Sequence, residues 1–259
     1  MASVAVLMGV GALVGGCIGL TGVGGGSLMT PILLFLGIPA PIAIGTDLFY
    51  ASFTKAGSAL VHWRHQHVQK QVLLMLATGS IPASLVTAQA LTRWPLHNTH
   101  LMTSTLAFML ALTGASLLFR RRIQQTIPGD APQPVSATFS ATRLWLTWLT
   151  GSILGVLVTL SSVGAGAVGV LLLTTLYPQL RLSRITGTDV AHAVLLTTTA
   201  GIGHWQAHHV NLSLLLTLCS TSLPAMYLGT RLGHHTPERI LRPLLGSTLL
   251  LVSLRFAFF

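Results

Sequence analysis

The sequence has few charged side chains and very few acidic ones. Only 7% of its 259 residues are charged, and Asp and Glu together number four. Soluble domains carry about 25% charged residues. Hydrophobic residues make up 51% of the chain, and its mean hydropathy is +0.74. A water-facing surface cannot be built from this composition, which excludes a soluble globular domain.

Cysteine and nucleotide-binding motifs are also scarce or absent. Cys17 and Cys219 each fall inside an apolar segment, which excludes a disulfide framework and a paired cysteine metal site. We expect both to be packing residues. No P-loop is present, so nothing in the sequence indicates that the protein is driven by nucleotide hydrolysis. The N-terminal apolar stretch lacks a basic segment and exceeds the core of a signal peptide, so we expect it to remain in the mature protein.

Long apolar runs recur from end to end, each able to cross a hydrocarbon core of about 30 Å as a helix. The net charge of +10 suits nucleic acid at first sight, but Lys and Arg lie in short connections between these runs. Positive-inside topology explains that distribution better. The expected surroundings are therefore a lipid bilayer, with no nucleic-acid partner.

Residues that lie 142 positions apart match more often than apolar composition explains. The matches are Gly45-Thr46-Asp47 with Gly187-Thr188-Asp189, His62-Trp63 with His204-Trp205, His67-Val68 with His209-Val210, and Ser80, Pro82 and Ala83 with Ser222, Pro224 and Ala225. This pattern indicates an internal duplication. We predict a first membrane repeat in residues 1–119, a cytoplasmic inter-repeat loop in 120–142 and a second membrane repeat in 143–259.

The same four apolar segments are predicted in each half of the chain. The first segment of each half, 2–37 or 144–177, is interrupted by glycines, and three helices follow it. These helices are expected at 42–62, 70–91 and 99–119, and at 185–204, 211–232 and 239–258. The predicted fold is an all-α polytopic membrane protein, each repeat containing a Gly-broken helical hairpin and three transmembrane helices.

The positions of Lys and Arg predict how the halves are oriented. If each broken segment enters the membrane and returns, eleven of these side chains lie on the cytoplasmic side and two, Arg93 and Arg255, lie outside. If each broken segment crosses once, seven lie inside and six outside. The positive-inside rule favours the first arrangement. We therefore expect inverted repeats, because each has an odd number of net crossings, with both termini outside the cytoplasm.

Three motifs together resemble those of the TauE/SafE sulfite exporter family, also called the toluene sulfonate uptake permease group. They are the glycine run from Gly22 to Ser27 with Pro31, the sequence Gly45-Thr46-Asp47, and the pair His62-Trp63. The resemblance spans nearly the whole chain. It implies a bacterial inner-membrane carrier, without a cofactor, for small sulfur-containing anions such as sulfite, thiosulfate or sulfonates. The chain departs from the family's common Gly-Thr-Ser by having Gly-Thr-Asp twice, and its second glycine run is thinner.

The glycine interruptions are the predicted substrate site, because irregular backbone at membrane depth is tolerated where it lines a cavity. Glycines let amides approach an anion, and the start of a half-helix aims a positive dipole at it. The predicted substrate-binding residues are Thr21, Gly22, Gly24, Gly25, Gly26, Ser27, Thr46, Lys55, Ser161, Ser162, Gly164, Gly166 and Thr188. The alternative is that glycines serve helix packing alone, as expected for Gly11, Gly15 and Gly19 at four-residue spacing.

Three ionisable residues fall inside predicted membrane helices. Lys55 stands near the middle of its helix, where a cation usually marks a transport pathway. The alternative is a structural ion pair with Asp47. Asp47 and Asp189 are predicted to couple transport to protons, because a carboxyl group taken out of water resists ionisation. Alternatively each caps its helix start, or the two form the dyad of an intramembrane aspartyl enzyme.

The histidines permit two interpretations. His62-Trp63 and His204-Trp205 end their helices on opposite faces of the inverted arrangement, where amphipathic rings commonly anchor a helix at the interface. The clusters formed by His62, His65 and His67 and by His204, His208 and His209 leave open a divalent metal-ion permease. Without paired carboxylates or cysteines, these ligand sets are incomplete, so no metal site is predicted.

Overall fold

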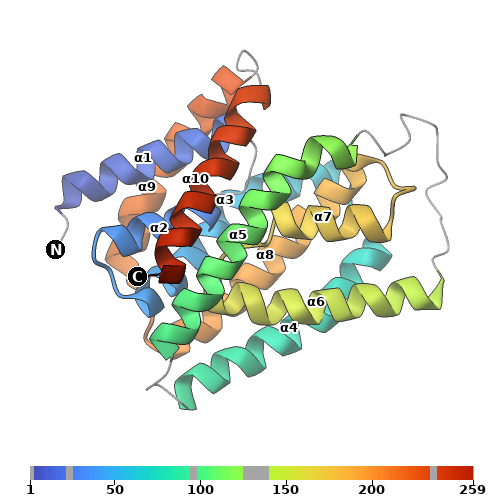
Figure 1. Ribbon diagram of the computed structural model, residues 1–259, viewed down its shortest axis with the longest axis horizontal. Coiled ribbons are helices and arrows are strands. Elements are labelled where there is room, and N and C mark those ends of the chain that lie inside the picture. Colours follow the sequence, from blue (N-terminus) through green and yellow to red (C-terminus); the bar gives the residue numbers. More distant parts are fainter. Residues whose placement is uncertain (1–2, 22–25, 94–97, 125–139, 234–237, 259) are drawn as a thin grey trace.

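The computed structural model describes residues 3–21, 26–93, 98–124, 140–233 and 238–258. Within these ranges the chain forms ten helices and no strand (Figure 1), which confirms the predicted all-α fold. The helices are α1 (Val4–Thr21), α2 (Gly26–Phe35), α3 (Ala40–Arg64), α4 (Lys70–Arg93), α5 (Asn98–Gln124), α6 (Ala141–Ser161), α7 (Ala167–Leu176), α8 (Leu182–Gln206), α9 (Leu212–Gly233) and α10 (Glu238–Phe258).

Four stretches among the described residues are long and apolar enough to cross a membrane: Lys70–Arg93, His100–Leu118, Ala141–Ser161 and Leu212–Leu232. The helices α3 and α8 contain ionisable residues and fall outside this set. Both are 25 residues long, or about 37 Å at 1.5 Å per residue. They pack against each other and against α9 and α4. Because other helices cover their polar faces, they can cross the bilayer without being uniformly apolar.

The main helix pairs are related by exchanging the two halves of the chain. Helix α1 packs on α9 and its counterpart α6 packs on α4, while α3 packs on α8 and α5 on α10. Each half therefore places its first helix on the fourth helix of the other half. The duplication read from the sequence thus corresponds to a two-fold arrangement of intertwined repeats.

Small residues allow these pairs to approach closely. Gly11, Gly15 and Gly19 of α1 face α9, and an added Cβ at each would overlap atoms of that helix. Gly151 and Gly155 of α6 are in the same position against α4. The packing role predicted for the glycine stripe is confirmed, as expected of membrane helices whose association depends on close contact between backbones.

Replacing Gly15 by leucine should destabilise the protein, because a side chain there overlaps the backbone and hydroxyl group of Ser222. Overpacking of a close contact costs about 1–3 kcal/mol or more. The neighbouring Gly16 has nothing within 4 Å of an added Cβ, so Gly16→Leu is the matched control. The measurement is the melting temperature in detergent. Equal stability of the two variants would contradict the assignment of this contact.

Helices α3 and α8 run antiparallel. Near one end of the pair, Gly45 of α3 lies against the His209 carbonyl group, and near the other end Gly187 of α8 lies against the carbonyl group of His67. Between them, the hydroxyl groups of Ser52 and Thr198 are 2.6 Å apart. Because α3 and α8 are equivalent helices, the two repeats are inverted. Their C-terminal turns, 62–70 and 204–210, lie at opposite ends of the pair.

The chain returns within each broken segment, as predicted. Gly11 of α1 lies beside Leu218 of α9 and Gly19 beside Met226, so these two helices run parallel. The turn 207–211 reverses the chain between α8 and α9, and α3 is antiparallel to α8, so α1 and α3 run in the same direction. The intervening helix α2 brings the chain back. The start of α1 and the end of α10 lie on the left of Figure 1, and the start of α6 lies on the right.

The connection between the repeats begins later than expected. Helix α5 continues to Gln124, and α6 begins at Ala141. The three arginines at 120–122, placed in a loop by the sequence analysis, extend α5 instead. Arginine and glutamine are good helix formers, and no glycine or proline interrupts this stretch.

Candidate functional site

The second glycine interruption joins α6 to α7 and contains three residues with positive φ. These are Ser162 (φ 59°), Gly164 (φ 108°) and Gly166 (φ 145°). Ser161 satisfies part of the broken backbone, because its hydroxyl group donates to the Leu157 carbonyl group at 2.6 Å and accepts from the amide of Val163 at 3.2 Å. The predicted break in this apolar segment is therefore present.

The first interruption, predicted at Gly22, Gly24 and Gly25, lies outside the described residues. Thr21 ends α1, and Gly26 and Ser27 begin α2, but their side chains are also outside the described part. The geometry of the candidate site is therefore built from the second interruption and from the helices around it.

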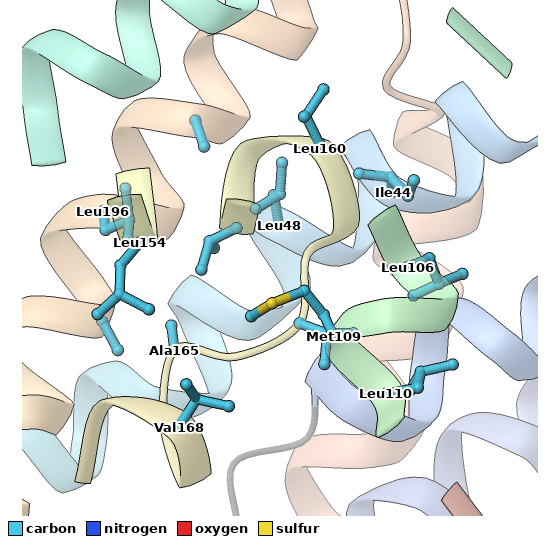
Figure 2. Packing of buried hydrophobic residues seen from close by; sticks show 14 of the residues in the cluster. Ile44, Leu48, Leu106, Met109, Leu110, Leu154, Leu160, Ala165, Val168 and Leu196 are labelled. Carbon is cyan, nitrogen blue, oxygen red and sulfur yellow. The ribbon is translucent and has the colours of Figure 1, made fainter. Parts of the chain in front are cut away.

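An apolar cluster encloses the second interruption. It combines Leu48 of α3, Met109 of α5 and Leu196 of α8 with Ala165, which precedes α7, and Val168 of α7 (Figure 2). The methyl group of Met109 lies where a side chain at Gly164 would be. Polar groups in this region are thus surrounded by hydrocarbon and have few partners besides one another.

Lys55 reaches this interruption from the middle of α3. Its side chain is only 7% exposed, and its ammonium group donates a hydrogen bond to the Ala165 carbonyl group. The ammonium nitrogen lies 4.0 Å from the position of an added Cβ at Gly166. The structure thus brings together Lys55 and the glycine break, which the sequence analysis had proposed as parts of one site.

The two membrane aspartates are both buried and both interact with Lys55. Asp189 contributes the stronger electrostatic interaction with the ammonium group and Asp47 the weaker one. Their exposed fractions are 1% and 0%. A simple pair of Lys55 with Asp47 is therefore an incomplete description, because the ammonium group interacts electrostatically with both carboxyl groups.

Each aspartate lies against the short helix of its own repeat. Thr30 of α2 donates a hydrogen bond of 2.5 Å to Asp47, and Ser162 lies beside the same carboxyl group. A Cβ at Gly169, in the first turn of α7, would overlap a carboxyl oxygen of Asp189. Asp189 thus occupies the amino-terminal end of α7, where the helix dipole favours a negative charge.

The threonines of the repeated Gly-Thr-Asp motif join the two repeats. The Thr46 hydroxyl group accepts from the amide of Asn211 at 3.1 Å, and that of Thr188 accepts from the amide of Gln69 at 2.9 Å. The glycine that precedes each threonine lets the turn of the other repeat approach the helix backbone closely. The structure therefore places Thr46 and Thr188 at inter-repeat contacts near the ends of α3 and α8, not at the second interruption.

His192 was missed by the sequence analysis. It is 1% exposed, and its Nε2 lies 2.8 Å from the hydroxyl group of Ser80. The equivalent residue in the first repeat, Tyr50, is hydrogen-bonded to Ser222. The signal was available, because an ionisable residue one helical turn after Asp189 in an apolar segment is itself a mark of function.

The His-Trp pairs are not simple interface anchors. Trp63 and Trp205 are 50% and 46% exposed, as that interpretation requires. His204 is only 1% exposed, however, and its Nε2 lies 2.9 Å from the carbonyl group of Thr159. The interpretation is therefore wrong for His204, because α4 and α6 cover this end of α8.

The remaining histidine clusters form ring contacts. The ring centroids of His62 and His67 are 5.6 Å apart, as are those of His204 and His209. Over the described part of the chain, no group of three or more His, Cys, Asp or Glu side chains is arranged to hold a metal ion.

Inverted helical repeats, interrupted helices and buried ionisable groups at the interruption are features found in membrane transporters. The sequence matches the model of the Sulfite exporter TauE/SafE family over residues 7–256. The chain belongs to the TauE/SafE sulfite exporter family, which confirms the resemblance found in its motifs.

Three similar proteins from Bacillus subtilis (strain 168) are each named a probable membrane transporter protein. The chain is 33% identical to the probable membrane transporter protein YjnA, over 98% of this chain and 99% of that protein. It is 25% identical to the probable membrane transporter protein YunE, over 85% and 84% of the two chains. It is 23% identical to the probable membrane transporter protein YdhB, over 89% and 90%. No solved structure matches the chain significantly.

Proposed function

We propose that this transporter is a secondary carrier for small sulfur-containing anions such as sulfite, thiosulfate or sulfonates. It acts in the inner membrane of a bacterium, with both termini outside the cytoplasm. The single observation that carries the proposal is the buried ammonium group of Lys55 at the second glycine interruption. A cation held beside open backbone in a low-dielectric site is suited to an oxyanion.

The charges around Lys55 support coupling to protons. The ammonium group faces two carboxyl groups, Asp189 and Asp47. When both are ionised, the site has a net negative charge and repels an anion. Binding of the substrate therefore requires that a carboxyl group take up a proton, so that anion and proton move together.

Asp189 supplies a structural route for this coupling. Its carboxyl group lies against Gly169 at the start of α7, where an oxyanion would be stabilised by the helix dipole. When Asp189 is protonated, its attraction to Lys55 and to the helix end is lost. The substrate anion then takes the place of the carboxylate beside the ammonium group.

The placement of the aspartates supports a carrier over an intramembrane aspartyl enzyme. A catalytic dyad requires two carboxyl groups that share one proton. Here Thr30 of α2 binds Asp47, whereas Asp189 lies against α7. Each carboxyl group has a separate partner of its own repeat, and each interacts electrostatically with Lys55.

Counterflow in proteoliposomes tests the proposal. Purified protein is reconstituted with an internal load of unlabelled sulfite, thiosulfate or a sulfonate, and uptake of the labelled anion is followed. We expect transient accumulation with at least one of these anions, and none with labelled phosphate or in protein-free liposomes. Absence of exchange with every sulfur anion would contradict the substrate class.

A further inference from the structure

The two repeats share the motifs that match at a spacing of 142 residues, but they are not packed alike. On the outward faces of the central helices α3 and α8, residues 142 positions apart are both well exposed. Phe53 and Leu195 are 54% and 42% exposed, and Leu60 and Ile202 are 52% and 47% exposed. These pairs mark the matching lipid-facing sides of the two helices.

The inward faces differ beyond the middle of each helix. Ala200 of α8 is 0% exposed, whereas its equivalent on α3, Ser58, is exposed. Gly203 is buried, whereas the equivalent Val61 is 54% exposed. On α3 the buried face therefore stops just past Lys55, while on α8 it continues to the end of the helix.

The partners of α8 explain its covered end. A Cβ at Gly203 would overlap the Cβ of Ala88 on α4, and the imidazole of His204 is bonded to the Thr159 carbonyl group of α6. The equivalent of Ala88 is Thr230 on α9, which is exposed. The end of α3 therefore lacks the cover from α9 that the end of α8 receives from α4.

We infer that this structure is one of two states of an alternating-access carrier. It is closed where α8 packs on α4 and α6 through Gly203 and His204, and open where the end of α3 stands away from α9. Since the two ends lie at opposite faces, Lys55 is reached from the face that carries His62. The inference rests on the proposed carrier function and adds to it the gate residues and the side of access.

The inverted repeats define the other state. In that state the end of α3 packs on α9, with Val61 against Thr230 as Gly203 now lies against Ala88, and the end of α8 is released from α4. The bond between His204 and Thr159 breaks in the exchange. The substrate site then opens to the face that carries His209.

Cysteine accessibility tests the inference without any knowledge of the substrate. In a background with Cys17→Ala and Cys219→Ala, Ser58→Cys and Ala200→Cys are made singly and reconstituted in one orientation. We expect a membrane-impermeant thiol reagent to modify Ser58→Cys from the His62 face. The reaction should be at least about tenfold faster than for Ala200→Cys from either face, because the minor state of such an equilibrium is populated at about 10% or less.

Leu60→Cys and Ile202→Cys are the matched controls, since their exposure is nearly equal. A lipid-soluble maleimide should modify both at similar rates. Modification of Ser58→Cys from the opposite face, or equal rates for Ser58→Cys and Ala200→Cys, would overturn the inference. Failure of anion counterflow would leave this accessibility result unchanged, so the two proposals fail separately.

A double variant tests the second state. We expect mild oxidation to join Val61→Cys to Thr230→Cys in the membrane, whereas Val61→Cys should not be joined to Ala88→Cys, which lies on the helix that covers α8. Absence of the first cross-link after prolonged oxidation would show that α3 and α9 do not close on each other.

Discussion

Lys55→Ala abolishes anion flux in proteoliposomes while the protein stays folded; this is the largest effect that we expect from a single substitution. The ammonium group is the buried cation at the interrupted backbone, and its loss leaves two carboxyl groups facing an incoming anion. Loss of the cation leaves buried carboxyl groups without a compensating charge, so flux should fall to the level of protein-free liposomes. Initial rates of counterflow measure it.

Two further variants separate loss of charge from loss of folding. The equivalent of Lys55 in the second repeat is Thr197, so Lys55→Thr places there a residue that the same fold already accommodates. It should be as inactive as Lys55→Ala, and it should elute as a monodisperse species, which shows that the protein still folds. Lys55→Arg keeps the charge but not the compact ammonium group, so it should retain measurable flux. Wild-type rates for the alanine and threonine variants would refute the role of Lys55.

Asp189→Asn uncouples anion movement from the pH gradient, which is the second large effect that we expect. For a monovalent anion carried with one proton, a gradient of about 1 pH unit drives about tenfold accumulation. The amide keeps the shape of the carboxyl group but cannot exchange a proton. The anion should therefore no longer accumulate inside the vesicles in response to the pH gradient, while its counterflow continues. Uptake driven by an imposed pH gradient, compared with counterflow in the same vesicles, measures this difference.

Asp47→Asn distinguishes the roles of the two carboxyl groups. Asp47 contributes the weaker interaction with Lys55 and is bound by Thr30, so its replacement should reduce coupling less than Asp189→Asn does. Thr30→Val is the companion variant, because it removes the hydrogen bond to Asp47 and leaves both carboxyl groups in place. If Asp189→Asn still supports tenfold accumulation, the proton is carried elsewhere, and His192 is then the next residue to replace.

Part of this molecule follows from local properties of the sequence. The composition identifies the bilayer as the solvent, because seven charged residues per hundred cannot cover a water-exposed surface. The matches at a spacing of 142 identify the duplication, and the count of Lys and Arg predicts its inversion. The antiparallel packing of α3 and α8 agrees with that prediction.

The components of the site were predicted more completely than its contacts. Lys55, Asp47, Asp189 and the break at Ser162–Gly166 all stand out in the sequence, because charge and irregular backbone are costly in a membrane. Thr46 and Thr188 stand out as well, since they belong to a repeated motif. The sequence does not reveal that these threonines bind the turns of the opposite repeat, because that contact joins residues far apart in the chain.

The sequence alone determined the class of protein, the helical segments and the inverted duplication, since these depend on hydropathy, spacing and the positions of charges. Only the tertiary structure decided that Lys55 meets the Ala165 carbonyl group and that Asp189 has the stronger electrostatic interaction with it of the two carboxyl groups. It also decided that His204 is buried while its equivalent His62 is less covered. Two nearly equivalent segments can differ in this way because packing depends on neighbours from the other repeat, which a local pattern does not contain.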